Sequence, residues 1–209
     1  DLSAKNAPWL TVKEITLAGV QVTAMRVSYI GELGWELHLS SNHLVQVYNA
    51  IMTNVDEIGG CQFGSYALNA MRIEKGYHGW GSDFGTEYTL FDSGLDRFAN
   101  MNKGDFIGRN AVKEQALKDS EWEWIGLEIT EVSSEPMSSD PILKDGKLVG
   151  YVTSSSHGYR TGKHCVLGYV RRGSVEIGSM CDVKVFGTLR AARRHSPHVY
   201  DPENSLLRS

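Results

Sequence analysis

The chain of 209 residues contains little cysteine, no long apolar run and no excess of positive charge. Its three cysteines, Cys61, Cys165 and Cys181, lack the spacing of a metal or redox motif, so we expect free thiols and a reducing compartment. No apolar run approaches the roughly 20 residues that span a bilayer, so we predict no membrane association. The formal net charge of −4 creates no field that attracts polyanions, and we predict no nucleic-acid partner.

Most sequence motifs of enzymes are also missing. The chain has no Gly-x-Gly-x-x-Gly fingerprint, no phosphate-binding Walker loop, no His-Glu-x-x-His helix and no Gly-x-Ser-x-Gly elbow. Its histidines lack metal-ligand spacing, so we predict no metal site. Cys165 falls in an apolar stretch and is predicted to be a small buried residue rather than a nucleophile. The basic run of residues 190–195 favours a solvated strand edge over a phosphate site.

Strand and helix patterns alternate in the first 120 residues. β-Rich stretches flank a turn at Ala18-Gly19, and residues 35–39 alternate apolar and polar side chains, which predicts strands over 10–39. Apolar residues at a spacing of three and four predict amphipathic helices. In the second of these, Leu68 and Met71 are expected to face inward. The helices are predicted over residues 44–52, 66–75 and 105–118.

From Trp124 onward the pattern changes to short strands separated by glycine turns at regular intervals. Such spacing is typical of a small antiparallel barrel or sandwich. We therefore predict an α+β protein with two domains, residues 1–120 and 121–209. The strands of the second domain are expected near residues 125–129, 148–153, 165–170 and 181–186.

One turn, residues 29–36 with the sequence Tyr-Ile-Gly-Glu-Leu-Gly-Trp-Glu, is well suited to a flat polar ligand. Gly31 and Gly34 allow left-handed backbone angles and close approach to a bound group. Tyr29 and Glu36 add a ring and a carboxylate. An ordinary hairpin bend explains the same residues by turn chemistry alone, so the turn needs support from other segments.

Two further segments give that support: the charged residues 72–75, Arg-Ile-Glu-Lys, and the aromatic and glycine-rich loop 78–83. A pterin ring needs an aromatic surface and a carboxylate that accepts two N–H bonds from its edge. A folate tail ends in glutamate, which a basic side chain binds. Tyr29, Glu36 and Arg72 are the required residue types. The alternative is that Glu36 and Arg72 merely pair with each other at a domain surface.

Residues 28–38 resemble the signature turn of the glycine-cleavage T-protein (aminomethyltransferase) superfamily. Residues 63–83 are most similar to the branch of that superfamily that is fused to dimethylglycine and sarcosine dehydrogenases. Three shorter segments resemble the family too, so the resemblance extends over nearly the whole chain. These segments are residues 105–111, 167–170 and 197–202.

The resemblance implies an aminomethyltransferase-like folate-binding lobe followed by a small C-terminal antiparallel β-barrel. Tetrahydrofolate is then expected in the central channel of a three-lobed body, where it accepts a one-carbon unit from oxidised dimethylglycine or sarcosine and becomes 5,10-methylenetetrahydrofolate. By position, Glu36 matches the glutamate that binds the pterin edge, Tyr29 an aromatic folate contact and Arg72 a basic folate contact. Trp80 is expected to form a wall of the channel.

The family's catalytic aspartate and the FAD-binding region of the dehydrogenase branch both precede the part that this chain resembles. We therefore expect no catalytic residue and no FAD site here, and a chain that is inactive alone. The chain begins at Asp1 without an initiator Met, and we expect a piece of a larger enzyme. Its expected partners are folate, a methylated amine and an upstream flavoprotein region. The resemblance implies the bacterial cytoplasm or the mitochondrial matrix.

Two other functions fit the same resemblance. One is a non-catalytic regulatory or binding module of this fold. The other is a stand-alone aminomethyltransferase or demethylase that acts on a different methylated donor. The sequence favours the folate-binding part of a dehydrogenase-like enzyme, because Glu36 is present and the turn around it is closer to the dehydrogenases.

Overall fold

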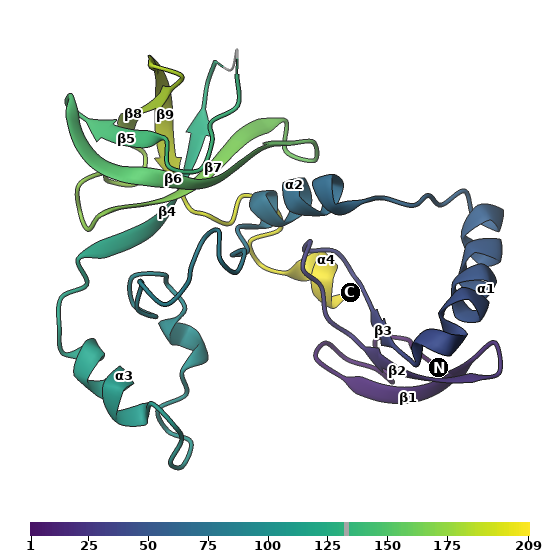
Figure 1. Cartoon of the computed structure of the whole chain (residues 1–209). Coiled ribbons are helices and arrows are strands. Elements are labelled where there is room, and N and C mark those ends of the chain that lie inside the picture. Colours follow the sequence, from purple (N-terminus) through teal and green to yellow (C-terminus); the bar gives the residue numbers. More distant parts are fainter. Residues whose placement is uncertain (132–133) are drawn as a thin grey trace. The chain divides into compact units, whose positions relative to one another are not determined.

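The computed structural model describes residues 1–131 and 134–209. Their contacts divide the chain into two compact units (Figure 1). The N-terminal unit contains residues 1–69 and 201–209, and the C-terminal unit contains residues 70–200. This division follows from packing within the chain. The sequence predicts a domain boundary near residue 120, which is a different property from this division by contacts, and that boundary stays a prediction.

The N-terminal unit contains an antiparallel sheet in the order β1-β2-β3. Ala18 and Gly19 join the first two strands with φ of 51° and 79°, as the predicted turn requires. Two positive φ angles give a turn whose twist matches the twist of the strands, so the hairpin closes without strain at the glycine. The elements of this unit are β1 (Val12–Leu17), β2 (Val20–Met25), β3 (Glu36–His38), η1 (Ser41–His43), α1 (Leu44–Glu57) and α4 (Ser205–Arg208).

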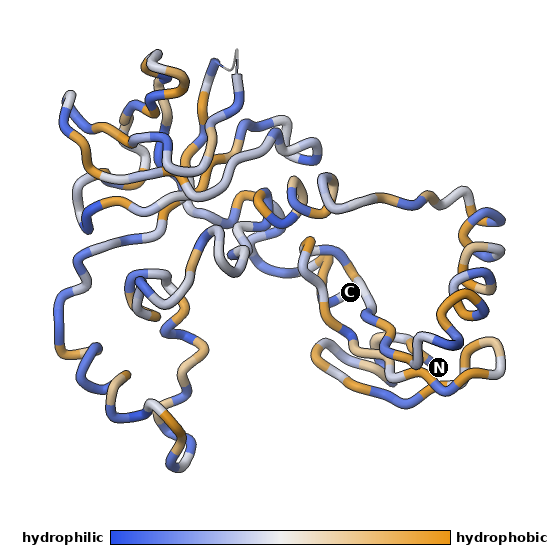
Figure 2. The backbone as a smooth tube through the Cα atoms, in the orientation of Figure 1, coloured by the Kyte–Doolittle hydropathy of each residue, from blue (hydrophilic) through white to orange (hydrophobic). Residues whose placement is uncertain are grey.

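The core of this unit lies between the sheet and α1. Alternation along β2 turns Val20 and Val22 toward the helix, where they pack against Val47. Hydrophobic and hydrophilic residues recur in turn along α1 (Figure 2). The predicted helix is confirmed, but Leu44 and Tyr48 of the expected apolar face are 56% and 45% exposed. Val47 is the residue of that face that the unit buries.

The C-terminal unit is built on a closed antiparallel barrel in the order β4-β7-β6-β5-β8-β9 (Figure 1). This confirms the barrel rather than the sandwich. Two strands lie outside the predicted ranges: β5, which is four residues long and begins at a proline, and β9. The six strands are β4 (Trp122–Ile129), β5 (Pro141–Lys144), β6 (Lys147–Gly158), β7 (Lys163–Arg171), β8 (Met180–Val185) and β9 (Thr188–His195).

Strand β7 has a core on both of its faces, which explains its nearly continuous apolar sequence. Val166 and Val170 point into the barrel core, whereas Leu167 and Tyr169 belong to a second cluster with Trp124 and Ile73. Cys165 is also in that second cluster, and its burial is confirmed. All three cysteines are free thiols, as predicted, and burial raises the pKa of the Cys165 thiol to about 11.

The basic run at residues 190–195 was expected at a solvated strand edge, and this is wrong. Strand β9 pairs with both β8 and β4, so the closed barrel leaves it no edge. Arg194 is 8% exposed, and its Nη1 lies 3.2 Å from Oε2 of Glu123. Arg193 is exposed, as expected for the outer face of the strand.

Between α2 (Ser65–Lys75) and the barrel, the C-terminal unit contains mostly turns, with a short 3₁₀ helix, η2 (Asp96–Phe98), and helix α3 (Arg109–Ala116). The predicted third helix is therefore shorter than the range 105–118. It begins after Gly108, whose φ of +89° is left-handed, and this turn leaves Ile107 outside the helix. Within the described parts of the chain, no helix is both long and apolar enough to cross a membrane.

Candidate functional site

The turn at residues 29–36 lies between β2 and β3 and needs its two glycines for different reasons. Gly31 has a φ of +84°, and its N–H donates to Oγ of Ser28 at 3.1 Å. Gly34 has no such angle, but a Cβ there would lie 3.1 Å from the carbonyl oxygen of Val27. One glycine therefore permits the bend, and the other permits the close return of the backbone.

Tyr29 and Glu36 stand at the two ends of this turn. Tyr29 is 38% exposed. Glu36 begins β3 opposite Met25 of β2, and its side chain is 57% exposed. Oε2 of Glu36 lies 3.4 Å from Nε2 of His38, which follows on the same face of the strand. The carboxylate of Glu36 is thus open to a ligand on one side and has a histidine beside it.

Helix α2 buries charged residues where the sequence predicted apolar ones. Leu68 is 37% exposed and Met71 is half-buried, so the prediction that these two residues face inward is wrong. The C-terminal half of the helix instead buries Arg72, Glu74 and Lys75 around Ile73. Burial of charged groups is costly unless they are paired and hydrogen-bonded. Arg72 and Glu74 form ion pairs, and Lys75 donates a hydrogen bond to a backbone carbonyl.

Arg72 is bound by a carboxylate and by backbone and hydroxyl oxygens. Its Nη1 forms an ion pair with Asp83 and donates to the carbonyl of Tyr77 at 3.0 Å. Its Nη2 donates to Oγ of Ser154 on β6 at 2.8 Å. The side chains of Arg72 and Asp83 are 5% and 0% exposed. The guanidinium therefore joins α2, the following loop and the barrel.

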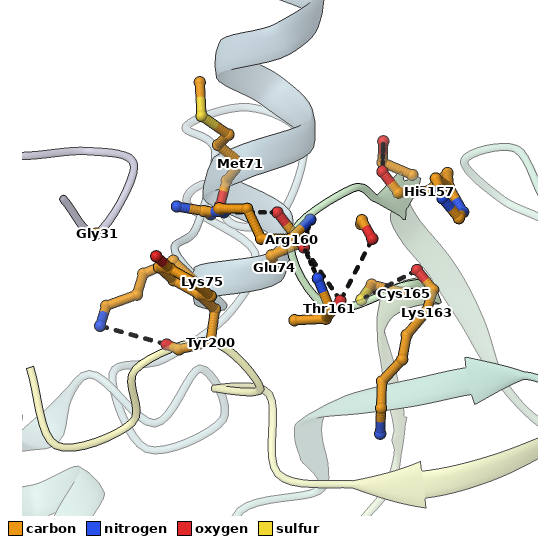
Figure 3. A network of polar contacts seen from close by, with 12 residues as sticks. Gly31, Met71, Glu74, Lys75, His157, Arg160, Thr161, Lys163, Cys165 and Tyr200 are labelled. Carbon is orange, nitrogen blue, oxygen red and sulfur yellow. Dashed lines mark hydrogen bonds and ion pairs between the residues drawn. The ribbon is translucent and has the colours of Figure 1, made fainter. Parts of the chain in front are cut away.

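The carboxylate of Glu74, on α2, is bound by the turn between β6 and β7, as Figure 3 shows. Its Oε1 accepts the backbone N–H groups of Arg160 and Thr161 at 3.0 and 2.9 Å, and its Oε2 accepts Nε of Arg160 at 2.8 Å. The guanidinium of Arg160 also lies 3.7 Å above the ring centroid of Tyr200. Nearby, Nζ of Lys75 donates to the carbonyl of Tyr200 at 3.4 Å.

The loop after α2 carries aromatic rings with different surroundings. His78 stacks on Trp124 with ring centroids 3.6 Å apart, and its burial lowers its pKa to about 4 although Asp83 opposes this shift. The imidazole is therefore neutral near pH 7. Trp80 meets Phe84 edge to face at 5.1 Å and is 73% exposed. The loop thus packs one ring on the barrel and presents another to solvent.

The predicted site residues fall in both units. Tyr29 and Glu36 belong to the N-terminal unit, and Arg72 and Trp80 belong to the C-terminal unit. Sequence reasoning missed Asp83 and the other partners of the buried charges. The charged residues of the second helix gave a signal that partners exist. Because those partners are as far away as Ser154 and Arg160, no local pattern could identify them.

An α+β protein with an exposed carboxylate turn and a closed six-stranded barrel is the class that the fold and these residues define. Two family models match the chain: "GCVT N-terminal domain" over residues 1–103 and "Glycine cleavage T-protein C-terminal barrel domain" over residues 123–201. The chain belongs to the glycine-cleavage T-protein (aminomethyltransferase) superfamily, a family of one-carbon transfer proteins.

Among its relatives is the mitochondrial dimethylglycine dehydrogenase of Homo sapiens, which is 35% identical over 188 residues. That match covers 90% of the chain and 22% of the relative. The mitochondrial sarcosine dehydrogenase of Mus musculus is 30% identical over 217 residues, which cover 100% of the chain and 23% of the relative. The chain thus spans less than a quarter of these two relatives.

A solved structure, the glycine cleavage system aminomethyltransferase T from Bartonella henselae, matches with a TM-score of 0.83. The match covers 96% of the chain and 55% of that protein at 20% sequence identity. At this identity the likeness shows the fold, which is the fold that the sequence predicted.

Proposed function

We propose that the chain is the tetrahydrofolate-binding part of a one-carbon transfer enzyme. In this proposal tetrahydrofolate accepts the methyl-derived carbon of oxidised dimethylglycine or sarcosine and becomes 5,10-methylenetetrahydrofolate. The support is the similarity to the two dehydrogenases together with the family's one-carbon chemistry. FAD would oxidise the amine in a region outside this chain, and the catalytic aspartate would also come from outside it.

The observation that carries the proposal is the exposed carboxylate of Glu36 beside a glycine turn. The 2-amino-pyrimidinone edge of a pterin offers two parallel N–H donors, which a carboxylate accepts as a charge-assisted pair. The close backbone return at Gly34 keeps the turn compact beside this carboxylate. Tyr29 supplies an aromatic side chain that is accessible to that ring.

We propose that Trp80 and Arg72, which belong to the C-terminal unit, also serve tetrahydrofolate binding. The exposed indole of Trp80 is suited to form an apolar wall for the folate. Arg72 is already bound to Asp83, so we propose that its contribution includes support of the loop that carries Trp80. The relatives' compartments lead us to propose the mitochondrial matrix or the bacterial cytoplasm for this enzyme.

The proposal is tested by calorimetric titration of tetrahydrofolate into the full-length polypeptide and its Glu36→Ala and Glu36→Gln variants. Loss of a charge-assisted pair of bonds costs about 1.5–3 kcal/mol, which corresponds to a roughly 10- to 100-fold weaker Kd. Glu57→Ala is the matched control, because Glu57 is an exposed carboxylate at the end of α1 in the same unit.

The control is expected to bind as the wild type does. Equal affinity of the wild type and Glu36→Ala would refute the role of Glu36. Absence of any tetrahydrofolate binding to the wild type, together with a stoichiometric protein partner, would instead favour the regulatory module.

A further inference from the structure

We propose that Asp83 is the positioning residue that holds the loop of residues 76–84 in the conformation that presents Trp80 to a ligand. The ligand part of this inference rests on the proposed function, in which that ligand is tetrahydrofolate. The holding part rests on geometry within the C-terminal unit alone. Asp83 has a side chain with 0% exposure, so it acts on Trp80 through the loop and does not touch the ligand.

The carboxylate of Asp83 joins three segments of the unit. Its Oδ2 forms an ion pair with Arg72 of α2 and accepts a hydrogen bond from the backbone N–H of Gly79 at 2.7 Å. Its Oδ1 accepts the hydroxyl of Thr153 on β6 at 2.5 Å. A carboxylate that is fully removed from water needs such partners to stay charged. Here one of them is the backbone of the residue that precedes Trp80.

Strand β6 is irregular at the point where it meets this carboxylate. Consecutive residues of a regular strand point to opposite faces, yet Thr153 donates to Asp83 while Ser154 accepts from Arg72. The pairing register with β7 shifts between Val152 and Ser154, which marks a β-bulge. Bulges redirect side chains, so this irregularity lets both hydroxyls serve one ion pair.

The loop itself is folded closely around the carboxylate. The N–H of Asp83 donates to the carbonyl of Gly79 at 2.8 Å, and the N–H of Gly81 donates to the carbonyl of Phe84 at 2.8 Å. A Cβ on Gly79 would lie 2.4 Å from Oγ of Ser82 and 3.4 Å from Nη2 of Arg72. The backbone at Gly79 therefore passes close to the guanidinium, and a side chain there would require Ser82 to move.

The rings on either side of this turn are held differently. His78 is stacked on Trp124 of β4, which anchors the start of the loop to the barrel. Trp80 meets the ring of Phe84 and is 73% exposed. With so little packing of its own, the indole takes its position from the backbone that Asp83 holds.

The holding role is tested by hydrogen exchange of the full-length protein with the Asp83→Asn substitution. The amide side chain of Asn lacks the charge that binds Arg72, so we expect faster exchange in residues 77–84. An exchange rate at least about tenfold higher corresponds to a loss of roughly 1.4 kcal/mol of local stability. The control is Glu123→Gln, which removes the ion pair of Glu123 with Arg194 elsewhere in the same unit. That control should leave exchange in residues 77–84 unchanged.

The ligand role is tested by a double-mutant cycle on tetrahydrofolate affinity. If Asp83 acts by placing the indole, Trp80→Ala weakens binding in the wild-type background but causes no further loss when combined with Asp83→Asn. Additive losses would overturn the positioning role. So would exchange that rises over the whole unit rather than in the loop, because that result indicates a general loss of stability.

The two proposals fail in different ways. A wild-type protein that does not bind tetrahydrofolate refutes the proposed function, while the exchange experiment still decides whether Asp83 holds the loop. Normal affinity of Asp83→Asn for tetrahydrofolate refutes the positioning role and leaves the proposed function intact.

Discussion

Glu74 is expected to be the residue whose loss most weakens the attachment of the β6–β7 turn to α2. It is 1% exposed, and the turn donates to it through two backbone N–H groups, a hydroxyl and a guanidinium nitrogen. In Glu74→Ala these donors lose their acceptor while they stay partly buried. Removing one partner of a buried ion pair costs about 3–5 kcal/mol, so an effect of that order is expected.

An ion pair that is more accessible to solvent gives the control for this substitution. Nζ of Lys163 lies 2.9 Å from Oε2 of Glu128, and their side chains are 43% and 29% exposed. Exposed pairs contribute about 0–1 kcal/mol. Glu128→Ala should therefore have little effect although its ion-pair distance is similar to that of Glu74 and Arg160, which is 2.8 Å. The comparison separates burial from distance as the cause.

The assay is native-state hydrogen exchange at the amides of Arg160 and Thr161, which donate directly to Glu74. Their protection factors give the free energy of local opening. We expect protection to fall strongly in Glu74→Ala and to change little in Glu128→Ala. Equal, small losses in the two variants would refute the reasoning, because they would show that the buried carboxylate contributes no more than an exposed one.

Two further predictions concern the same unit. Burial lowers the pKa of His78 from 6.5 to about 4 in the folded state. The contribution of the neutral imidazole to stability is therefore complete above pH 6.5 and is lost as the pH falls toward 4. Each unit of pKa shift corresponds to about 1.4 kcal/mol. Urea unfolding at several pH values checks this, and His78→Phe should flatten the dependence. Gly150→Ala should destabilise the barrel by about 1–3 kcal/mol, since its Cβ would lie 2.0 Å from the carbonyl oxygen of Tyr169, and a lower melting temperature is the readout. The control is Gly173→Ala, whose added Cβ has nothing within 4 Å but whose φ is +75°, so it reports the backbone cost alone.

The hairpins of the C-terminal unit were predictable because their signals are local, whereas the choice of a barrel came from the family resemblance. Asp145 and Gly146 form a turn with φ of 51° and 75°, and such turns between apolar runs identify hairpins. Strand β5 was missed because it has four residues and begins with Pro141. The burial of Arg194 was missed because closure of the barrel is a property of all six strands, which no single run of residues encodes.

The candidate site was predictable in part. The turn with Tyr29 and Glu36 is contiguous, so its glycines and its residue types could be interpreted together. The inward face of α2 was predicted wrongly because the periodicity rule assigns the core to apolar residues such as Leu68. Here the buried residues include Arg72 and Glu74, on two sides of Ile73, and their partners come from the loop and the barrel.

The choice of ion pairs over apolar contacts at this helix has a consequence for the proposed site. Arg72 and Glu74 are two residues apart, so they leave the helix in directions about 200° apart. One binds Asp83 and β6, and the other binds the turn at Arg160. Apolar packing tolerates small rotations of a helix, whereas two sets of directional bonds on opposite sides restrict both its rotation and its translation. Trp80 follows this helix by five residues, and its position is therefore set by the bonds of Arg72 and Glu74 as well as by Asp83.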